Sequence, residues 1–125
     1  MTQVLVIEDE PLIRENILDL LVAEDFEVLG AADGAQGLQI ARERIPDLIL
    51  CDILLPQLDG YRVIQQLRGD PATAAIPFIL ITAEVERFDV QHGIPLKAND
   101  YLAKPFTRVE LLDAIDARLN KPPEP

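Results

Sequence analysis

The chain has 125 residues, of which 49% are hydrophobic and 26% charged, as expected for one globular domain with its own core. Its net charge of −11 argues against direct binding of DNA or RNA, because such a surface repels a polyanion. The single cysteine, Cys51, excludes an internal disulfide, and no apolar run approaches the length of a membrane span. Since no signal peptide follows Met1, we expect a cytoplasmic protein without membrane contact.

The chain begins with a strand pattern that is followed by a helix pattern. Residues 3–7 are apolar and rich in β-branched side chains, which predicts a buried strand. An acidic run, residues 8–10, comes next, and Pro11 stands at a favourable first helical position. Apolar residues then recur at helical spacing up to about Ala23, and residues 26–30 predict a second short strand.

A second helix and a third strand are predicted next. Asp33 and the glutamine three residues later, Gln36, have the spacing of a capping box, and the helix is expected to stop before Pro46. Residues 47–52 are a short apolar run between two prolines, which predicts a buried strand rather than a helix. This strand ends in the carboxylate of Asp52, where the chain reaches the surface.

The second half of the chain continues the alternation. Residues 60–67 predict a third helix, and a Gly-Asp-Pro sequence ends it. Two more strands are predicted over residues 78–82 and 100–103, separated by an irregular segment at 83–98. A last helix, with a second capping box at its start, has a buried stripe that continues to Leu119.

Five alternations of strand and helix predict an α/β domain, in which helices cover both faces of a parallel sheet. We expect one domain over residues 1–120. Residues 121–125 are rich in proline and cannot continue the helix, so they are interpreted as a tail or as the start of a linker.

Polar groups of distinct chemistry stand at the ends of four predicted strands. They are Glu8 and Asp9 after the first strand, Asp52 at the end of the third, Thr82 at the fourth and Lys104 after the fifth. The carboxyl ends of parallel strands lie at the same edge of a sheet, where ligands bind. Clustered carboxylates repel one another unless a cation is present, and Mg²⁺ prefers such oxygen ligands. A carboxylate beside Mg²⁺ can act as a nucleophile and form an aspartyl phosphate.

These motifs, in this order and spacing, resemble a bacterial two-component response-regulator receiver domain over residues 3–119. The matching motifs are Val6 to Glu10, Asp52 with Leu55 to Gly60, Ile81 to Ala83, and Asp100 to Phe106. The resemblance implies a flavodoxin-like three-layer sandwich, doubly wound, with a five-stranded parallel sheet of order 2-1-3-4-5. It also implies a phosphorylation-activated signalling switch, which catalyses only its own phosphorylation and dephosphorylation and is not an enzyme for other substrates.

The resemblance assigns a role to each polar residue at the strand ends. Asp52 would accept a phosphoryl group from a sensor histidine kinase or a histidine phosphotransfer protein. Glu8, Asp9 and Asp52 would hold Mg²⁺ together with the backbone carbonyl of Leu54. Lys104 would contact the phosphoryl group, and its peptide bond to the following proline would be cis.

The resemblance further implies that phosphorylation changes a surface around the fifth strand and the last helix. Thr82 would move toward the phosphate and Tyr101 would turn inward, so that an output domain or partner protein, unidentified by the sequence, reads the change. A homodimer is a further possible partner state, because dimerisation through the last helix and its neighbours is common in the family. Three positions depart from the usual pattern, namely Leu55 in place of methionine, Lys97 in place of glycine, and the carboxylate Glu84 near the site.

Other interpretations give different functions to the same residues. The acidic run could serve only to begin a helix, and for Glu10 this interpretation is preferred. A phosphatase with an aspartate nucleophile would need a second carboxylate two residues after Asp52, where the chain has Leu54. A receiver that is never phosphorylated and serves as a docking scaffold is the remaining alternative. A dinucleotide site is excluded, because no Gly-x-Gly-x-x-Gly follows the first strand.

Overall fold

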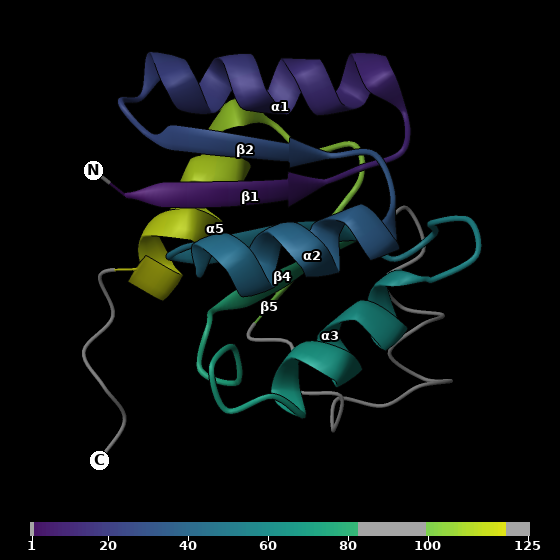
Figure 1. Ribbon diagram of the computed structural model, residues 1–125. Coiled ribbons are helices and arrows are strands. Elements are labelled where there is room, and N and C mark those ends of the chain that lie inside the picture. Colours follow the sequence, from purple (N-terminus) through teal and green to yellow (C-terminus); the bar gives the residue numbers. More distant parts are fainter. Residues whose placement is uncertain (1, 83–99, 120–125) are drawn as a thin grey trace.

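The computed structural model describes residues 2–82 and 100–119, in which strands and helices alternate along the chain (Figure 1). Within these ranges the elements are β1 Gln3–Ile7, α1 Pro11–Ala23, β2 Glu27–Ala31, α2 Gly34–Arg44, β3 Leu48–Asp52, α3 Gly60–Arg68, β4 Phe78–Thr82, β5 Asp100–Ala103 and α5 Arg108–Leu119. The irregular segment at 83–98 and the tail at 121–125 lie outside the described residues. No helix of the described chain is long and apolar enough to cross a bilayer.

The strands form one parallel sheet of order β2-β1-β3-β4-β5, which confirms the predicted fold class and strand order. β1 pairs with both β2 and β3, so that Val4 lies between Val28 and Leu48. The strand predicted over residues 26–30 begins one residue later, at Glu27. Its first predicted residue, Phe26, donates its backbone N–H to the carbonyl of Leu21 and therefore still belongs to the turn after α1.

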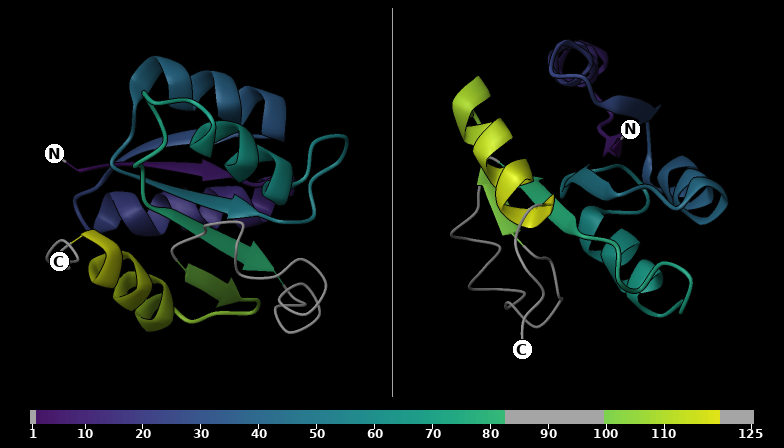
Figure 2. Two further views of the ribbon diagram at one scale, coloured as in Figure 1. Left: turned by 90° about the horizontal axis from the view of Figure 1, so that it is seen from below. Right: turned by 90° about the vertical axis from the view of Figure 1, so that its left-hand side faces the viewer.

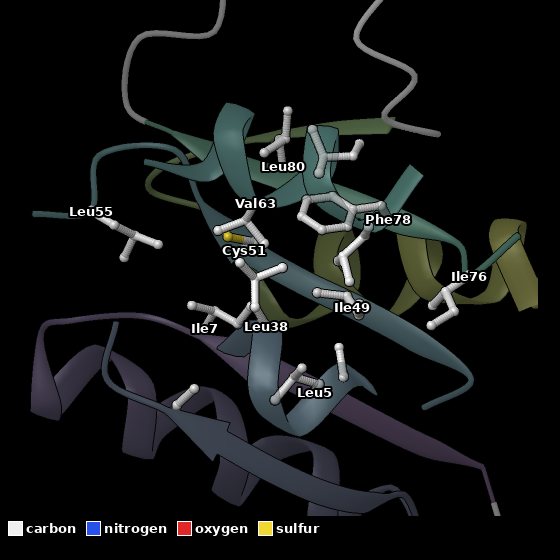
Figure 3. Packing of buried hydrophobic residues seen from close by; sticks show 14 of the residues in the cluster. Leu5, Ile7, Leu38, Ile49, Cys51, Leu55, Val63, Ile76, Phe78 and Leu80 are labelled. Carbon is white, nitrogen blue, oxygen red and sulfur yellow. The ribbon is translucent and has the colours of Figure 1, made fainter. Parts of the chain in front are cut away.

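Alternate side chains of the sheet enter two separate apolar layers, because successive residues of a strand point to opposite faces. Helices α2 and α3 cover one face and α1 and α5 cover the other (Figure 2). The first layer includes Cys51, which belongs to the same buried cluster as Val63 and Leu38 (Figure 3). The side chains of β1, β3 and β4 are almost wholly shielded from solvent, in keeping with their near-continuous apolar sequences, whereas the edge strand β2 is partly exposed.

The helix starts follow the predicted capping residues. Thr107 Oγ1 accepts a hydrogen bond from the Glu110 N–H at 3.1 Å, and Glu110 Oε1 accepts one from the Thr107 N–H at 2.9 Å. Asp33 Oδ1 accepts a bond from the Gln36 N–H at 2.8 Å, whereas the Gln36 side chain accepts from Ala32, one residue before the cap. These bonds satisfy N–H groups that have no partner inside the helix.

The acidic residue before the first helix acts as its cap. The Glu10 side chain accepts a hydrogen bond from the Leu12 N–H at 3.3 Å, and Pro11 occupies the first helical position. Glu10 is thereby drawn into the helix start, in agreement with the helix-start interpretation of this residue. Glu8 and Asp9 remain at the end of β1, where the sheet meets the surface.

Candidate functional site

The carboxylates of Glu8, Asp9 and Asp52 converge at the carboxyl ends of two neighbouring strands. Glu8 and Asp9 follow β1, and Asp52 ends β3. One carboxylate oxygen from each residue lies within 4.8 Å of the other two. Only 2% of Glu8 and 6% of Asp52 is exposed, whereas Asp9 is exposed to solvent. The strand order reverses between β1 and β3, which is the position where open parallel sheets bind ligands.

The ammonium group of Lys104 joins two of these carboxylates. Its Nζ donates hydrogen bonds of 2.7 Å to Glu8 Oε1 and of 2.7 Å to Asp52 Oδ2. Lys104 follows β5 and precedes Pro105 through a cis peptide bond, as the resemblance implies. The side chain is 20% exposed, so it reaches the buried carboxylates from the rim of the site.

Backbone groups hold the remaining oxygens of the two buried carboxylates. The Glu10 N–H donates to Glu8 Oε2 at 3.1 Å, and the Leu54 N–H donates to Asp52 Oδ1 at 3.0 Å. The guanidinium of Arg14, from the first turns of α1, donates to the Glu8 carbonyl at 2.7 Å. The two carboxylates are therefore oriented by groups of the fold itself, before any ligand binds.

The electrostatics of the site reflect burial and pairing together. Burial raises the pKa of Glu8 against the opposing hydrogen bonds from Lys104 and Glu10, and the Asp52 charge raises it further. Burial would lower the pKa of Lys104, but its bonds to Asp52 and Glu8 outweigh this effect and raise the pKa. Lys104 thus stays charged at neutral pH. One ammonium facing three carboxylates leaves negative charge for a further cation to balance.

The donor set fits Mg²⁺. Three carboxylates supply hard oxygen atoms within a short distance of one another, and Asp9 opens the cluster to solvent. Mg²⁺ favours such ligands and retains water molecules in its remaining positions, which an exposed rim permits. Within the described residues, this is the group of acidic, histidine or cysteine side chains whose geometry suits a metal ion.

The loop after Asp52 closes tightly against the end of β3. The Gly60 N–H donates to the Ile53 carbonyl at 2.9 Å. A Cβ atom at Gly60 would lie 2.7 Å from the Asp52 carbonyl oxygen and 2.8 Å from Ile53 Cα, so a larger residue would push α3 away from the strand. Gln57 in the same loop has a φ of 68°, in the left-handed region. Gly60 therefore keeps the helix start close to Asp52.

The chain matches one known protein family over nearly its whole length. The sequence profile described as "Response regulator receiver domain" matches residues 4–116. The chain belongs to this receiver-domain family. The acidic cluster at its strand ends is of the type found at the phospho-accepting sites of receiver domains.

Solved and curated relatives agree with this classification. One similar structure is the receiver domain of the sensor histidine kinase PA1611 from Pseudomonas aeruginosa, which was solved with a magnesium ion coordinated in its active-site cleft. It is 32% identical in sequence, has a TM-score of 0.90, and the match covers 96% of this chain and 98% of that one. Protein PilH of the same species is 35% identical over 95% of this chain and 98% of PilH. The transcriptional regulator RpaA of Synechocystis is 38% identical over 97% of this chain but only 50% of RpaA. The chain thus spans about half the length of RpaA and nearly all of PilH.

Two of the predicted site residues are placed only by their backbone. Thr82 ends β4, pairs in register with Ala103 and so stands next to the strand end that leads to Lys104. Tyr101 lies within β5. The side chains of Thr82 and Tyr101 are outside the described part of the structure, as are Glu84 and Lys97. The Leu54 carbonyl as a metal ligand stays a prediction of the receiver-domain resemblance.

Arg14 is absent from the site predicted by sequence, although it contacts the backbone of Glu8. A local signal exists, because Arg14 is the only basic residue between positions 11 and 23, in a helix that follows an acidic run. This pattern indicates that a positively charged side chain lies near the acidic residues of the receiver domain. It does not say that the guanidinium binds a carbonyl rather than a carboxylate.

Proposed function

We propose that this receiver domain, residues 1–120, is a phosphorylation-activated switch of a two-component phosphorelay, in which Asp52 is the phosphoryl acceptor. The observation that carries the proposal is the position of Lys104, which bonds Asp52 and Glu8 together inside a cluster completed by Asp9. Phosphoryl transfer depends mainly on positioning and on balancing charge, and these are the features that the cluster offers.

Asp52 is suited to act as the nucleophile. Its carboxylate accepts hydrogen bonds from the Leu54 N–H and from Lys104, and two carboxylate oxygens together accept about four such bonds. Lone pairs therefore remain for attack on phosphorus. An Asp52 oxygen would form a new bond to phosphorus while the bond from phosphorus to the donor's histidine nitrogen breaks, and the released imidazole takes up a proton.

Glu8, Asp9 and Asp52 would hold Mg²⁺, with the Leu54 carbonyl as a further ligand. The bound ion would supply positive charge to the phosphoryl oxygens. Lys104 Nζ already donates a 2.7 Å hydrogen bond to Asp52 Oδ2. A small movement of this ammonium group would bring it to an oxygen of a phosphoryl group on Asp52. Its raised pKa keeps it protonated for that role.

The signal would leave the site through Thr82 and Tyr101 on β4 and β5, as the family resemblance implies. A sensor histidine kinase or a histidine phosphotransfer protein would be the phosphoryl donor. A separate protein, or an output domain beyond residues 121–125, would read the changed surface. The DNA binding named for RpaA belongs to that longer protein, and the switch proposed here acts in the cytoplasm without touching nucleic acid itself.

Intact-protein mass spectrometry after incubation with acetyl phosphate and Mg²⁺ tests the proposal. We expect the mass of one phosphoryl group to be added, and we expect the addition to disappear in EDTA and in Asp52→Asn. Asp19→Asn is the matched control, because Asp19 is an exposed acid on α1. It should be phosphorylated like the unaltered protein.

The result also separates the switch from the scaffold interpretation. If Mg²⁺ binds but neither acetyl phosphate nor a mixture of histidine kinases labels the protein, the chain is a phosphorylation-silent receiver. Partner capture with the unphosphorylated protein would then identify what it docks to. Phosphorylation that persists in Asp52→Asn would contradict the assignment of the acceptor.

A further inference from the structure

The guanidinium of Arg14 binds the peptide group that links two of the proposed metal ligands. Its Nη1 donates a 2.7 Å hydrogen bond to the Glu8 carbonyl, which belongs to the peptide bond between Glu8 and Asp9. Arg14 is partly buried, and within the described residues it forms no ion pair with a carboxylate. Its defined polar contact is therefore with the backbone of the acidic site.

We propose that Arg14 is a positioning residue that raises the affinity of the acidic site for Mg²⁺. This inference rests on the proposed function, because it assumes that Glu8, Asp9 and Asp52 hold the ion. Arg14 acts through the backbone of Glu8 and Asp9 and does not touch the ion or the phosphoryl group.

Asp9 is the ligand that depends most on this backbone contact. Glu8 is held by the Glu10 N–H and by Lys104, and Asp52 by the Leu54 N–H and by Lys104. No hydrogen bond is found to the Asp9 carboxylate from the described part of the chain. Asp9 can therefore be presented to an ion only by the backbone that carries it.

The backbone at this point is fixed from two sides. The Glu8 N–H donates to the Ala31 carbonyl of β2 at 3.0 Å, and the Glu8 carbonyl accepts from Arg14. Past Ile7, the pairing of β1 with β3 ends, so no further ladder bond from β3 restrains the peptide that leads to Asp9. Arg14 replaces that missing restraint.

The stem of Arg14 is itself held against the sheet. A Cβ atom built on Gly30 of β2 would lie 3.7 Å from Arg14 Cδ and 3.1 Å from Leu18 Cδ1, so the absence of a side chain at Gly30 leaves room for both residues. A guanidinium whose stem is packed in this way loses little further freedom when it binds the carbonyl. The packing of the Arg14 stem therefore favours the hydrogen bond from its guanidinium to the Glu8 carbonyl.

Three possible roles of Arg14 predict different changes in Mg²⁺ affinity when its guanidinium is removed. A positioning role predicts weaker binding, typically by about 10–100-fold for a group that orients a metal ligand. A purely electrostatic role predicts tighter binding, because a positive charge that repels the ion has been removed. A merely structural role predicts a lower melting temperature with unchanged affinity.

Isothermal titration of the chain with MgCl₂ distinguishes these outcomes. We expect Arg14→Met to weaken Mg²⁺ binding about tenfold or more, and Arg14→Lys to lie between it and the unaltered protein. Arg44→Met is the matched control, since it removes the same charge from an exposed position at the end of α2. It should bind Mg²⁺ within about twofold of the unaltered protein, as a distant exposed charge is largely screened by salt.

Unchanged or tighter Mg²⁺ binding by folded Arg14→Met would overturn the positioning role. If Arg14→Met does not fold, Arg14→Lys decides the question, and affinity equal to that of the unaltered protein would overturn the role. Asp9→Asn should weaken Mg²⁺ binding sharply; failure of the unaltered protein to bind Mg²⁺ would refute both this inference and the metal site. Mg²⁺ binding without phosphorylation would instead contradict the proposed function alone.

Discussion

Replacing Lys104 by methionine removes a cation that is bonded to two buried carboxylates. At 2.7 Å and an effective dielectric constant of about 20, each ion pair corresponds to about 6 kcal/mol of gross attraction, much of which only offsets the desolvation of the charges. Removing one partner of a buried pair typically costs about 3–5 kcal/mol. Because Lys104 is 20% exposed and Glu8 can take up a proton, we expect a loss of about 2–4 kcal/mol in the free energy of unfolding, in EDTA at pH 7.

The same variant has a predictable pH dependence. The hydrogen bond and charge of Lys104 lower the pKa of Glu8, so the variant raises that pKa further above its ordinary value of 4.5. Between pH 4.5 and the raised pKa, Glu8 holds a proton in the native state that it has released in the unfolded state. The free energy of unfolding therefore falls as the pH rises through this range. The destabilisation of Lys104→Met should accordingly become smaller as the pH is lowered from 7 toward 5.

Urea unfolding followed by circular dichroism measures both effects. Excess Mg²⁺ should restore part of the lost stability, because an ion that binds only the native state stabilises it. Arg44→Met should change the free energy of unfolding by no more than about 0.5 kcal/mol, as an exposed substitution. Unaltered stability of Lys104→Met at pH 7, or a destabilisation that grows as pH falls, would show that Lys104 does not offset the charge of the two buried carboxylates.

Three further predictions concern the fold around the site. Burial raises the pKa of the Cys51 thiol well above 9.0. Native protein should therefore react with a thiol reagent at least about a thousandfold more slowly than urea-unfolded protein. Above pH 9.0 only the thiol of the unfolded chain ionises, so the free energy of unfolding should fall as the pH rises further. Rapid labelling of native protein would show that Cys51 is accessible. Gln57→Gly should raise the free energy of unfolding by roughly 0.5–1 kcal/mol, because glycine adopts a φ of 68° without steric cost; a lower melting temperature would count against this. Gly60→Ala should lower it by about 1–3 kcal/mol through the contact with the Asp52 carbonyl, and a neutral effect in urea unfolding would show that α3 can shift freely.

Local sequence patterns predict the helices and strands well where boundary residues, such as glycine and proline, agree with the hydrophobic periodicity. The strand that ends at Asp52 is buried along its whole length, and α3 ends at Arg68 immediately before the predicted break. The one-residue error at the second strand arises at Phe26, whose N–H is taken by the end of α1. No local sequence pattern predicts whether a backbone N–H at such a boundary donates to the end of a helix or to a neighbouring strand.

Long-range contacts and unusual backbone conformations are what the patterns leave open. Lys104 and Glu8 are 96 residues apart, and their contact follows only from the strand order that the receiver resemblance implies. Ile45, at the end of α2, has a φ of 44°, which a β-branched residue adopts rarely and which therefore has no signal in the sequence. The contact of Arg14 with a carbonyl depends likewise on packing against Gly30, not on the residue types alone.

We propose that Asp52, and no other carboxylate of the cluster, carries the phosphoryl group. Borohydride reduces an aspartyl phosphate to homoserine, so peptide mass mapping after treatment with acetyl phosphate, Mg²⁺ and borohydride locates the acceptor. We expect homoserine at position 52 alone, and none when EDTA replaces Mg²⁺. Conversion at Asp9 or at Asp59, or conversion that does not require Mg²⁺, would contradict this proposal.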